Sequence, residues 1–305
     1  MSSGALSRAV GDLGTAGFRE RLRGRSLGVR LGPFDVAIRS DVAAIDEPLY
    51  RLYRDYPLLD EPRVFHFHVR LAASGTRVRM LVDGRAPHDD LPIEQALAVL
   101  EWGLNLVIAL RSHSLLMLHS AAVERGGRVL LLPAWPGSGK TTLCAALVHR
   151  GWRLFSDEFG LVRPHSGEVL PIPRPMPLKN ESIAVIRAFA PDAEFGPTIP
   201  NTRKGTIAHV KAPLASVGGA ATPARAGWIV FPKWSATEPA AFAAMPKAEA
   251  FLMLATNSFN YEMLGEAAFT AVRELVSTAR CFRLVYSELE RAIPLLNELA
   301  AGDGA

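Results

Sequence analysis

The sequence predicts an α/β protein with a P-loop core, preceded by an N-terminal α+β region. Three observations lead to this prediction. An apolar strand, a Gly-rich loop and a helix follow one another around Arg128–Thr142, a later strand ends in the carboxylates Asp157 and Glu158, and short alternating strands occupy the first part of the chain. Strand, Gly-rich loop and helix in that order give a phosphate-binding loop its structural context. We expect the N-terminal region at residues 1–115 and the P-loop domain at 116–305.

The loop itself reads AWPGSGKT over 134–141, with Ala134 where the strict motif has glycine. Gly137 and Gly139 allow the backbone to curl so that successive N–H groups point inward, and the helix adds its positive N-terminal end. Lys140 is expected to reach the β- and γ-phosphates of a nucleoside triphosphate, and the Thr141 hydroxyl to ligate Mg²⁺. The flanking strand and helix disfavour the alternative, a Gly-Ser turn before a surface helix. Nucleotide contacts are expected from Pro136, Gly137, Ser138, Gly139, Lys140, Thr141 and Thr142.

Two further groups are candidates for chemistry. Asp157 and Glu158 follow a strand at 152–156, where a triphosphate and Mg²⁺ would lie. Neighbouring strand residues point to opposite faces, so we expect different roles for the two carboxylates. Arg203 and Lys204, on a turn-forming loop, could neutralise a transferring phosphate. The alternatives are a polar strand end for the first pair and a solvated loop for the second.

The N-terminal region is expected to contain short strands and helices. In order, we expect a loose surface helix within 1–27, strands at 29–31 and 34–40, a helix at 47–56, strands at 64–71 and 77–82, and a long helix at 92–116. The strand at 64–71 alternates apolar and polar residues and could pair with 77–82 across Ser74-Gly75. It places His66 and His68 on one face, but no third ligand is in view, so ordinary strand histidines are favoured over a metal site.

The C-terminal region alternates strands and helices. A strand at 118–123 turns back at once into the loop strand, where a Rossmann-like domain would have a helix. After the loop we expect a strand at 152–156, a Pro-rich connection at 171–177, a helix at 178–189, a strand at 206–210, a small-residue linker at 213–226, a strand at 227–231, helices at 248–255 and 261–279, a strand at 281–286 and a last helix at 287–299. Ser287 and Glu290 would form its capping box.

Composition places the chain among ordinary globular proteins. Of its 305 residues 49% are hydrophobic and 21% charged, with a net charge of +4. No basic pattern interleaved with aromatic residues is present, so nucleic acid is not an expected partner. The apolar segment 96–118 is interrupted by Glu101, Arg111 and His113, which indicates a buried helix and not a membrane span. Cys144 and Cys281 lack metal-ligand spacing and indicate buried thiols in a reducing compartment. No signal peptide is evident, so we expect a cytoplasmic protein.

Five segments together carry a family resemblance. They are LHSAAV (118–123), AWPGSGKT (134–141), LFSDEF (154–159), RPMPLKNES (174–182) and NTRKGT (201–206). They resemble the HPr kinase/phosphorylase superfamily, most closely its HPr-kinase-related kinase A group, over most of the chain. The resemblance to HPr kinases themselves covers about 117–165, and their LE(V/I)RG signature is absent. The resemblance implies a P-loop kinase core, shared with ATP-dependent phosphoenolpyruvate carboxykinases.

The resemblance implies an ATP- and Mg²⁺-dependent kinase that phosphorylates a hydroxyl, on a serine of a peptide or small protein. It assigns the general base to Asp157, assisted by His119, and the second metal ligand beside Thr141 to Glu158. Two alternatives stay open: a small-molecule kinase on the same core, and a non-catalytic nucleotide-dependent binding protein. The guanine-reading NKxD pattern is absent, which argues against a GTPase switch. The sequence does not decide between a monomer and a homo-oligomer, and the N-terminal region is a candidate for partner recognition.

Overall fold

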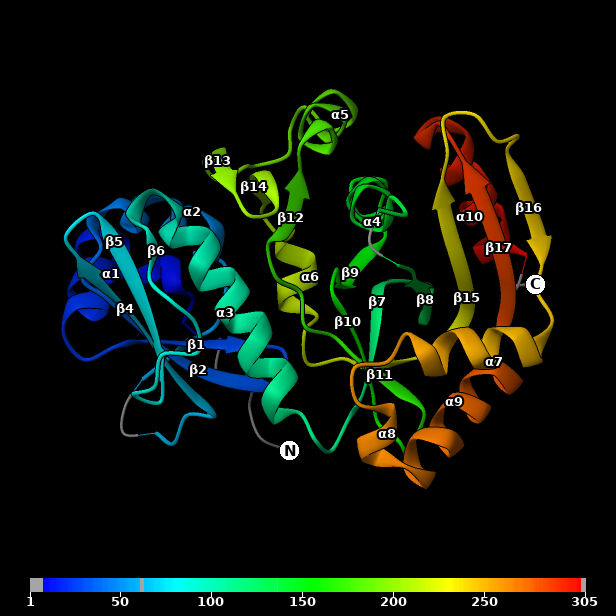
Figure 1. Cartoon of the computed structure of the whole chain (residues 1–305), viewed down its shortest axis with the longest axis horizontal. Coiled ribbons are helices and arrows are strands. Elements are labelled where there is room, and N and C mark those ends of the chain that lie inside the picture. The colour runs from blue at the N-terminus through cyan, green and yellow to red at the C-terminus, as the bar shows by residue number, and fades with distance from the viewer. Residues whose placement is uncertain (1–7, 61–62, 136, 303–305) are drawn as a thin grey trace.

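The chain is a mixed α/β protein. The computed structural model describes residues 8–60, 63–135 and 137–302. Within these residues the strands form a six-stranded sheet, an eight-stranded sheet and a three-stranded sheet. Figure 1 shows the six-stranded sheet on the left, the eight-stranded sheet on the right, and the small sheet above and between them.

The six-stranded sheet is built from the N-terminal region, with strand order β3-β1-β2-β4-β5-β6. Its strands are β1 (Leu27–Leu31), β2 (Phe34–Ser40), β3 (Leu58–Leu59), β4 (Phe67–Ser74), β5 (Arg77–Val82) and β6 (Leu91–Pro92). The helices here are α1 (Gly14–Arg23), α2 (Asp46–Tyr53) and α3 (Ala96–Arg111), with 3-10 turns η1 (Val10–Leu13), η2 (Ala43–Ile45) and η3 (Ile93–Gln95). The expected pairing of β4 with β5 is confirmed, and β1 pairs with β2; both pairings are antiparallel.

Helix α3 is shorter than the expected helix at 92–116, because residues from Leu116 onward enter the large sheet. In the described chain, Ile93–Arg111 is the segment long and apolar enough to cross a membrane by length and composition. However, 67% of its most apolar window is buried inside the protein. Its apolar character is therefore that of a core helix, as expected from the sequence.

The eight-stranded sheet carries the Gly-rich loop. Its strands are β7 (Leu116–Arg125), β8 (Arg128–Pro133), β9 (Arg153–Ser156), β10 (Phe159–Val162), β11 (Glu168–Leu170), β15 (Ala224–Trp234), β16 (Ala241–Ala244) and β17 (Arg280–Tyr286). The expected hairpin is confirmed: β7 pairs antiparallel with β8. Strands β8, β15 and β17 are parallel neighbours, so their carboxyl ends meet at one edge of the sheet. The loop after β8 begins at that edge.

The remaining elements of the described chain are the strands of the small sheet and seven helices of the C-terminal region. They are β12 (Met176–Lys179), β13 (Ile199–Thr202) and β14 (Gly205–Val210), and the helices α4 (Lys140–Val148), α5 (Glu181–Phe189), α6 (Leu214–Gly218), α7 (Lys247–Thr256), α8 (Tyr261–Leu264), α9 (Glu266–Thr278) and α10 (Leu289–Ala301). Pro177 is accommodated in β12 because this is an edge strand, paired only with β14 in its sheet.

Several sequence-based expectations about these elements are wrong. The helix expected from 178 begins at Glu181, since Leu178 and Lys179 belong to β12. The helix expected at 261–279 is interrupted at Gly265, where φ is +54°. The linker at 213–226 contains α6 and the start of β15. No capping box forms at the last helix: its N-cap residue is Glu288, without a side-chain capping bond.

One large hydrophobic core joins the two regions of the chain. It includes Leu97, Leu104 and Ile108 of α3 together with Leu143 and Leu147 of α4. A second core, between the large sheet and α7 and α9, is confined to the C-terminal region. The shared core fixes α3 close to the edge of the large sheet where the loop lies.

Candidate active site

The Gly-rich loop is fixed by the ends of the two parallel strands beside it. Gly137 and Gly139 have φ of +88° and +81°, as their positions in a curled loop require. A side chain at residue 139 would lie 2.5 Å from the Tyr286 Oη atom, so glycine is also required there for space. The Tyr286 hydroxyl donates a hydrogen bond to the Gly139 carbonyl (3.0 Å), and the backbone N–H of Trp234 donates to the Ser138 carbonyl (2.9 Å). The neighbouring expected contact, Pro136, lies outside the described residues.

The cavity in front of this loop, which we call the phosphate pocket, has a volume of about 530 Å³. It is lined by the loop, by the first turn of α4 and by the side chains of His119, Glu158, Lys179 and Lys204. Lys140 is only 8% exposed, and within the described chain its Nζ atom has no hydrogen-bond partner. A buried ammonium without a partner is costly unless an anion completes its hydrogen bonds. The pocket is therefore suited to an anionic ligand.

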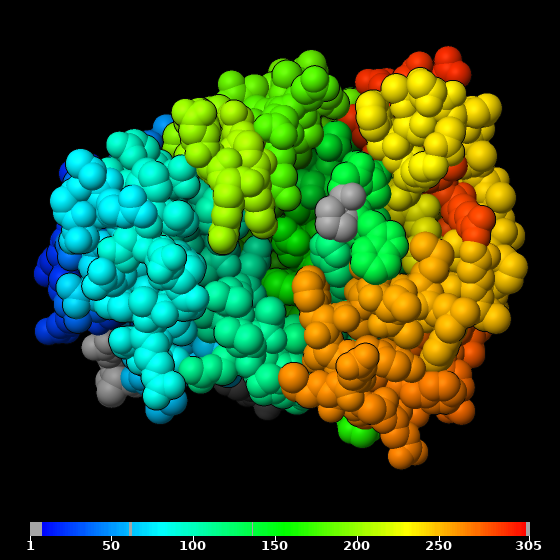
Figure 2. All heavy atoms as spheres, in the orientation of Figure 1, coloured from blue at the N-terminus to red at the C-terminus, as the bar shows by residue number. Residues whose placement is uncertain are grey.

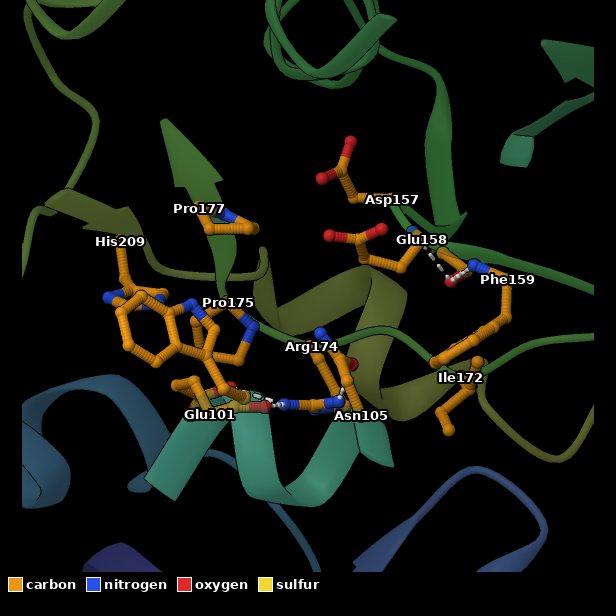
Figure 3. Close-up of a pocket in the computed structure, with 12 residues that line it drawn as sticks. Glu101, Asn105, Asp157, Glu158, Phe159, Ile172, Arg174, Pro175, Pro177 and His209 are labelled. Atoms are coloured by element: carbon orange, nitrogen blue, oxygen red, sulfur yellow. Dashed lines mark hydrogen bonds and ion pairs between the residues drawn. The ribbon is translucent and has the colours of Figure 1, made fainter. Parts of the chain in front are cut away.

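Asp157 and Glu158 lie at a break between two strands. Both β9 and β10 pair antiparallel with β7, and the chain bends at these two residues before pairing resumes at Phe159. The Ser156 hydroxyl stabilises the bend by accepting the N–H groups of Glu158 (3.3 Å) and Phe159 (3.0 Å). The expectation that the carboxylates point to opposite faces is wrong, because it assumed a regular strand. Figure 3 shows both side chains on the same side of the break.

The contacts of the two carboxylates are exchanged relative to the sequence-based assignment. The Thr141 hydroxyl donates to the Asp157 Oδ2 atom (3.1 Å), whereas the His119 Nε2 atom lies 3.8 Å from Glu158 Oε2. We had expected His119 beside Asp157 and Thr141 beside Glu158. The reason is the bend, which directs Asp157 toward α4 and Glu158 toward β7.

Burial and neighbouring charges alter the protonation of this cluster. Desolvation, followed by the Glu158 charge, raises the pKa of Asp157 to about 7. The side chain is 6% exposed and its Oδ1 atom has no hydrogen-bond partner among the described residues. Desolvation and the nearby Lys140 ammonium lower the pKa of His119 below its usual value. Without a ligand, Asp157 is therefore about half protonated near pH 7, whereas His119 is mostly neutral.

The two loop cations lie beside the aromatic ring of Trp102 on α3. The Arg203 guanidinium carbon is 5.2 Å and the Lys204 Nζ atom 5.5 Å from the ring centroid. Lys204 lines the phosphate pocket, whereas Arg203 is not among the residues that line it. Desolvation and the charge of Lys179 lower the pKa of Lys204. Lys179 was missed because nothing in the sequence distinguishes it from an ordinary surface lysine.

A small cavity lies on the other side of the carboxylates, between them and α3 (Figure 3). This carboxylate pocket has a volume of about 20 Å³, enough for a single water molecule. Arg174 lines it and is held by α3, where it donates to Glu101 Oε2 (2.5 Å) and to Asn105. His209, fully buried, also lines it, and neither ring nitrogen has a hydrogen-bond partner within the described residues. Sequence reasoning noted His209 only as a strand residue.

The two N-terminal histidines are not arranged as expected. Strand β4 begins at Phe67, so His66 precedes it, and the His66 Nδ1 atom accepts the N–H of Asp35 (3.0 Å). Among the described residues no group of three or more His, Cys, Asp or Glu side chains is placed to hold a metal ion. Thr141 and Asp157 remain candidates for Mg²⁺, which is commonly bound by one or two protein oxygens together with phosphate oxygens and water.

Comparison with known proteins does not identify a family: no protein-family model matches the chain, and neither does any curated protein.

Proposed function

We propose that this chain is an ATP- and Mg²⁺-dependent kinase with a P-loop core related to that of HPr kinases. Its acceptor in this proposal is a hydroxyl group, on a serine of a peptide or small protein. The acceptor class comes from the sequence resemblance, as does the superfamily. A cytoplasmic location accords with the two buried, unpaired cysteines.

The observation that carries the proposal is a pair of buried ionisable groups at the loop whose hydrogen bonds are incomplete. Lys140 Nζ and Asp157 Oδ1 are both enclosed, and neither has a hydrogen-bond partner in the described structure. A triphosphate oxygen would complete the bonding of the ammonium, and a divalent cation that of the carboxylate. The residues present therefore fit Mg-ATP. The N-terminal end of α4 adds N–H groups directed at the same place.

The contacts of the carboxylates suggest a division of roles. Thr141 and Asp157, already hydrogen-bonded to each other, would hold Mg²⁺, which when bound would neutralise charge on the β- and γ-phosphates. Glu158 lines both the phosphate pocket and the carboxylate pocket, so it is the carboxylate placed to accept the proton of an incoming hydroxyl. Neutral His119 would orient Glu158. This assignment exchanges the roles that the resemblance implies.

The remaining cations of the pocket would act on the transferring phosphate. Lys140 would bind it in the ground state, and Lys204 with Lys179 would stabilise the charge that develops during transfer. An acceptor would approach through the hollow in Figure 2, between α3 with β13–β14 on one side and α7–α8 on the other. Trp102 and the carboxylate pocket lie on the α3 side of this approach.

Two variants test the division of roles. Asp157→Asn should weaken Mg²⁺ dependence and Mg-ATP binding together, because it removes the metal-binding charge. Glu158→Gln should keep Mg-ATP affinity while transfer falls by about 100-fold or more, the range for losing a general base. Calorimetric titration gives the affinities and single-turnover phosphate transfer gives the rates. Loss of metal binding in Glu158→Gln, with only transfer lost in Asp157→Asn, would restore the original assignment.

The function itself is tested by incubating the protein with Mg-ATP and a library of serine-containing peptides, followed by mass spectrometry for phosphate. Lys140→Ala is the negative control, because it removes the ammonium at the phosphates. Phosphorylated metabolites without phosphopeptides would indicate a small-molecule kinase. Tight ATP binding without any transfer would indicate a nucleotide-dependent binding protein. Equal ATP affinity in wild type and Lys140→Ala would contradict the phosphate-loop assignment.

A further inference from the structure

A second large cavity adjoins the phosphate pocket. This side pocket, with a volume of about 560 Å³, is lined by α5, by the residues at the ends of β15 and β17, and by the start of α10. Gly139, Thr142 and Ser182 line both cavities, so the two are continuous across the start of α4. Figure 1 shows α4 between α5 on one side and the strands β15 and β17 on the other. The volume of the side pocket lies within the range of small-molecule binding sites.

The walls of the side pocket are apolar and partly exposed. Val185 and Phe189 come from α5, Trp234 from the end of β15, and Leu289 from α10. Trp234 is 49% exposed and Val185 44%, unusually high for large apolar side chains that line a cavity. The Trp234 Nε1 atom donates to the Ser287 carbonyl (3.1 Å), which holds the indole in place. A fixed, half-exposed indole is a surface on which a flat aromatic ligand can stack.

The side pocket is also bonded directly to the loop. The backbone N–H of Trp234 donates to the Ser138 carbonyl, and the Tyr286 hydroxyl donates to the Gly139 carbonyl. Two residues of the side pocket therefore hold the loop that would bind the phosphates. A ligand in the side pocket would therefore lie next to Ser138 and Gly139, whose backbone belongs to the proposed phosphate-binding loop.

The charges of the two cavities are opposite. Lys140, Lys179 and Lys204 line the phosphate pocket, whereas three glutamates line the side pocket: Glu181, Glu288 and Glu290. Glu288 is engaged by Arg291 (2.9 Å). The carboxylates repel phosphate and accept hydrogen bonds from amino groups, so a ligand with a polyanionic end and an amino-bearing aromatic end would bind in one direction only.

We propose that the side pocket binds the base of the nucleotide whose phosphates the loop holds. The base stacks on Trp234 against Val185, and Glu181 and Glu290 accept hydrogen bonds from its exocyclic amino group. This inference rests on the proposed function, because it requires a nucleoside triphosphate in the phosphate pocket. It adds the residues that would recognise the adenine base: Trp234 and Val185 through its ring, and Glu181 and Glu290 through its amino group.

The test compares Mg-ATP with inorganic magnesium triphosphate, which lacks the base, by calorimetric titration. Trp234→Ala and Val185→Gln should each weaken ATP binding by roughly 10-fold or more, as expected when a base–aromatic contact is lost. Triphosphate affinity should stay within about twofold of wild type, which also shows that the loop remains folded. Trp234→Phe keeps an aromatic face and should retain most of the ATP affinity. Val64→Gln, at an apolar residue that is 91% exposed, is the matched control for Val185→Gln.

The outcomes separate this inference from the proposed function. Wild-type ATP affinity in Trp234→Ala and Val185→Gln, with ATP binding lost in Lys140→Ala, would overturn the base pocket and leave the kinase proposal standing. Equal loss of ATP and triphosphate affinity would also overturn it, because the residues would then act through the loop. Inosine triphosphate has a carbonyl in place of the amino group but can still stack on Trp234, so it should bind more weakly than ATP and more tightly than triphosphate. Binding as tight as that of ATP would overturn the role of Glu181 and Glu290.

Discussion

Asp157 provides the sharpest prediction, because its burial links the stability of the unliganded protein to pH. Its pKa is about 7 in the folded protein against an ordinary value of 3.8. Between these two values the folded state holds a proton that the unfolded state has released, so stability falls as the pH rises through this window. At about 1.4 kcal/mol per pKa unit, the charged carboxylate costs up to about 4 kcal/mol above pH 7 and less than about 2 kcal/mol near pH 5.

Asp157→Asn removes this titration, so the variant should be more stable than wild type by up to about 4 kcal/mol at pH 8. The difference should shrink by about 2–3 kcal/mol at pH 5. Urea unfolding of both proteins in the presence of a metal chelator, at both pH values, measures it. The exposed Asp192→Asn is the control and should change stability by no more than about 0.5 kcal/mol at either pH. A variant less stable than wild type at pH 8, or a difference independent of pH, would refute the reasoning.

Three further predictions concern the pocket. Lys204→Ala should lower the rate of transfer roughly 10-fold or more with little change in ATP affinity. Arg203→Ala should change the rate and the ATP affinity by less than about threefold, because Arg203 does not line the phosphate pocket. Equal rates in the two variants would show that the loop cations act alike. Gly139→Ala should lose most ATP binding in titrations, because an alanine there meets Tyr286 as well as an unfavourable φ, while Gly75→Ala, with a positive φ but no close neighbour, should bind ATP normally. His119→Ala should reduce single-turnover transfer less than Glu158→Gln does, and an unchanged rate would remove His119 from the site.

Short-range patterns in the sequence correctly predicted the elements whose formation depends on neighbouring residues. The β7–β8 hairpin and the strand, loop and helix around Lys140 follow from apolar runs bounded by glycines, and the structure contains both. The edge position of β12 agrees with Pro177 in the strand and the prolines just before it. The pairing of β4 with β5 was also predicted, because Ser74-Gly75 marks the turn between the two strands.

The parts that were missed depend on contacts between distant segments. The bend at Asp157 and Glu158 requires β9 and β10 to pair with the same edge of β7, which periodicity within ten residues cannot show. For the same reason the exchanged partners of the two carboxylates could not be predicted. Lys179 and the side pocket have no motif of their own, and they become visible only when α5 and the ends of β15 and β17 are placed around α4.

The buried Arg174–Glu101 ion pair bears on how proteins of this architecture can diversify. Arg174 lies beside the carboxylate pocket, and its partner belongs to α3 of the N-terminal region. Replacing residues 1–115 by an unrelated segment would leave the Arg174 guanidinium buried without its carboxylate partner, which would lower the stability of the fold by about 3–5 kcal/mol. It would also expose the shared core. The N-terminal region is therefore an integral part of the fold, and replacing it as a unit is expected to destabilise the protein. In the proposed kinase, we expect acceptor specificity to change through substitutions on the surface of α3 that leave Glu101 and its packing in place.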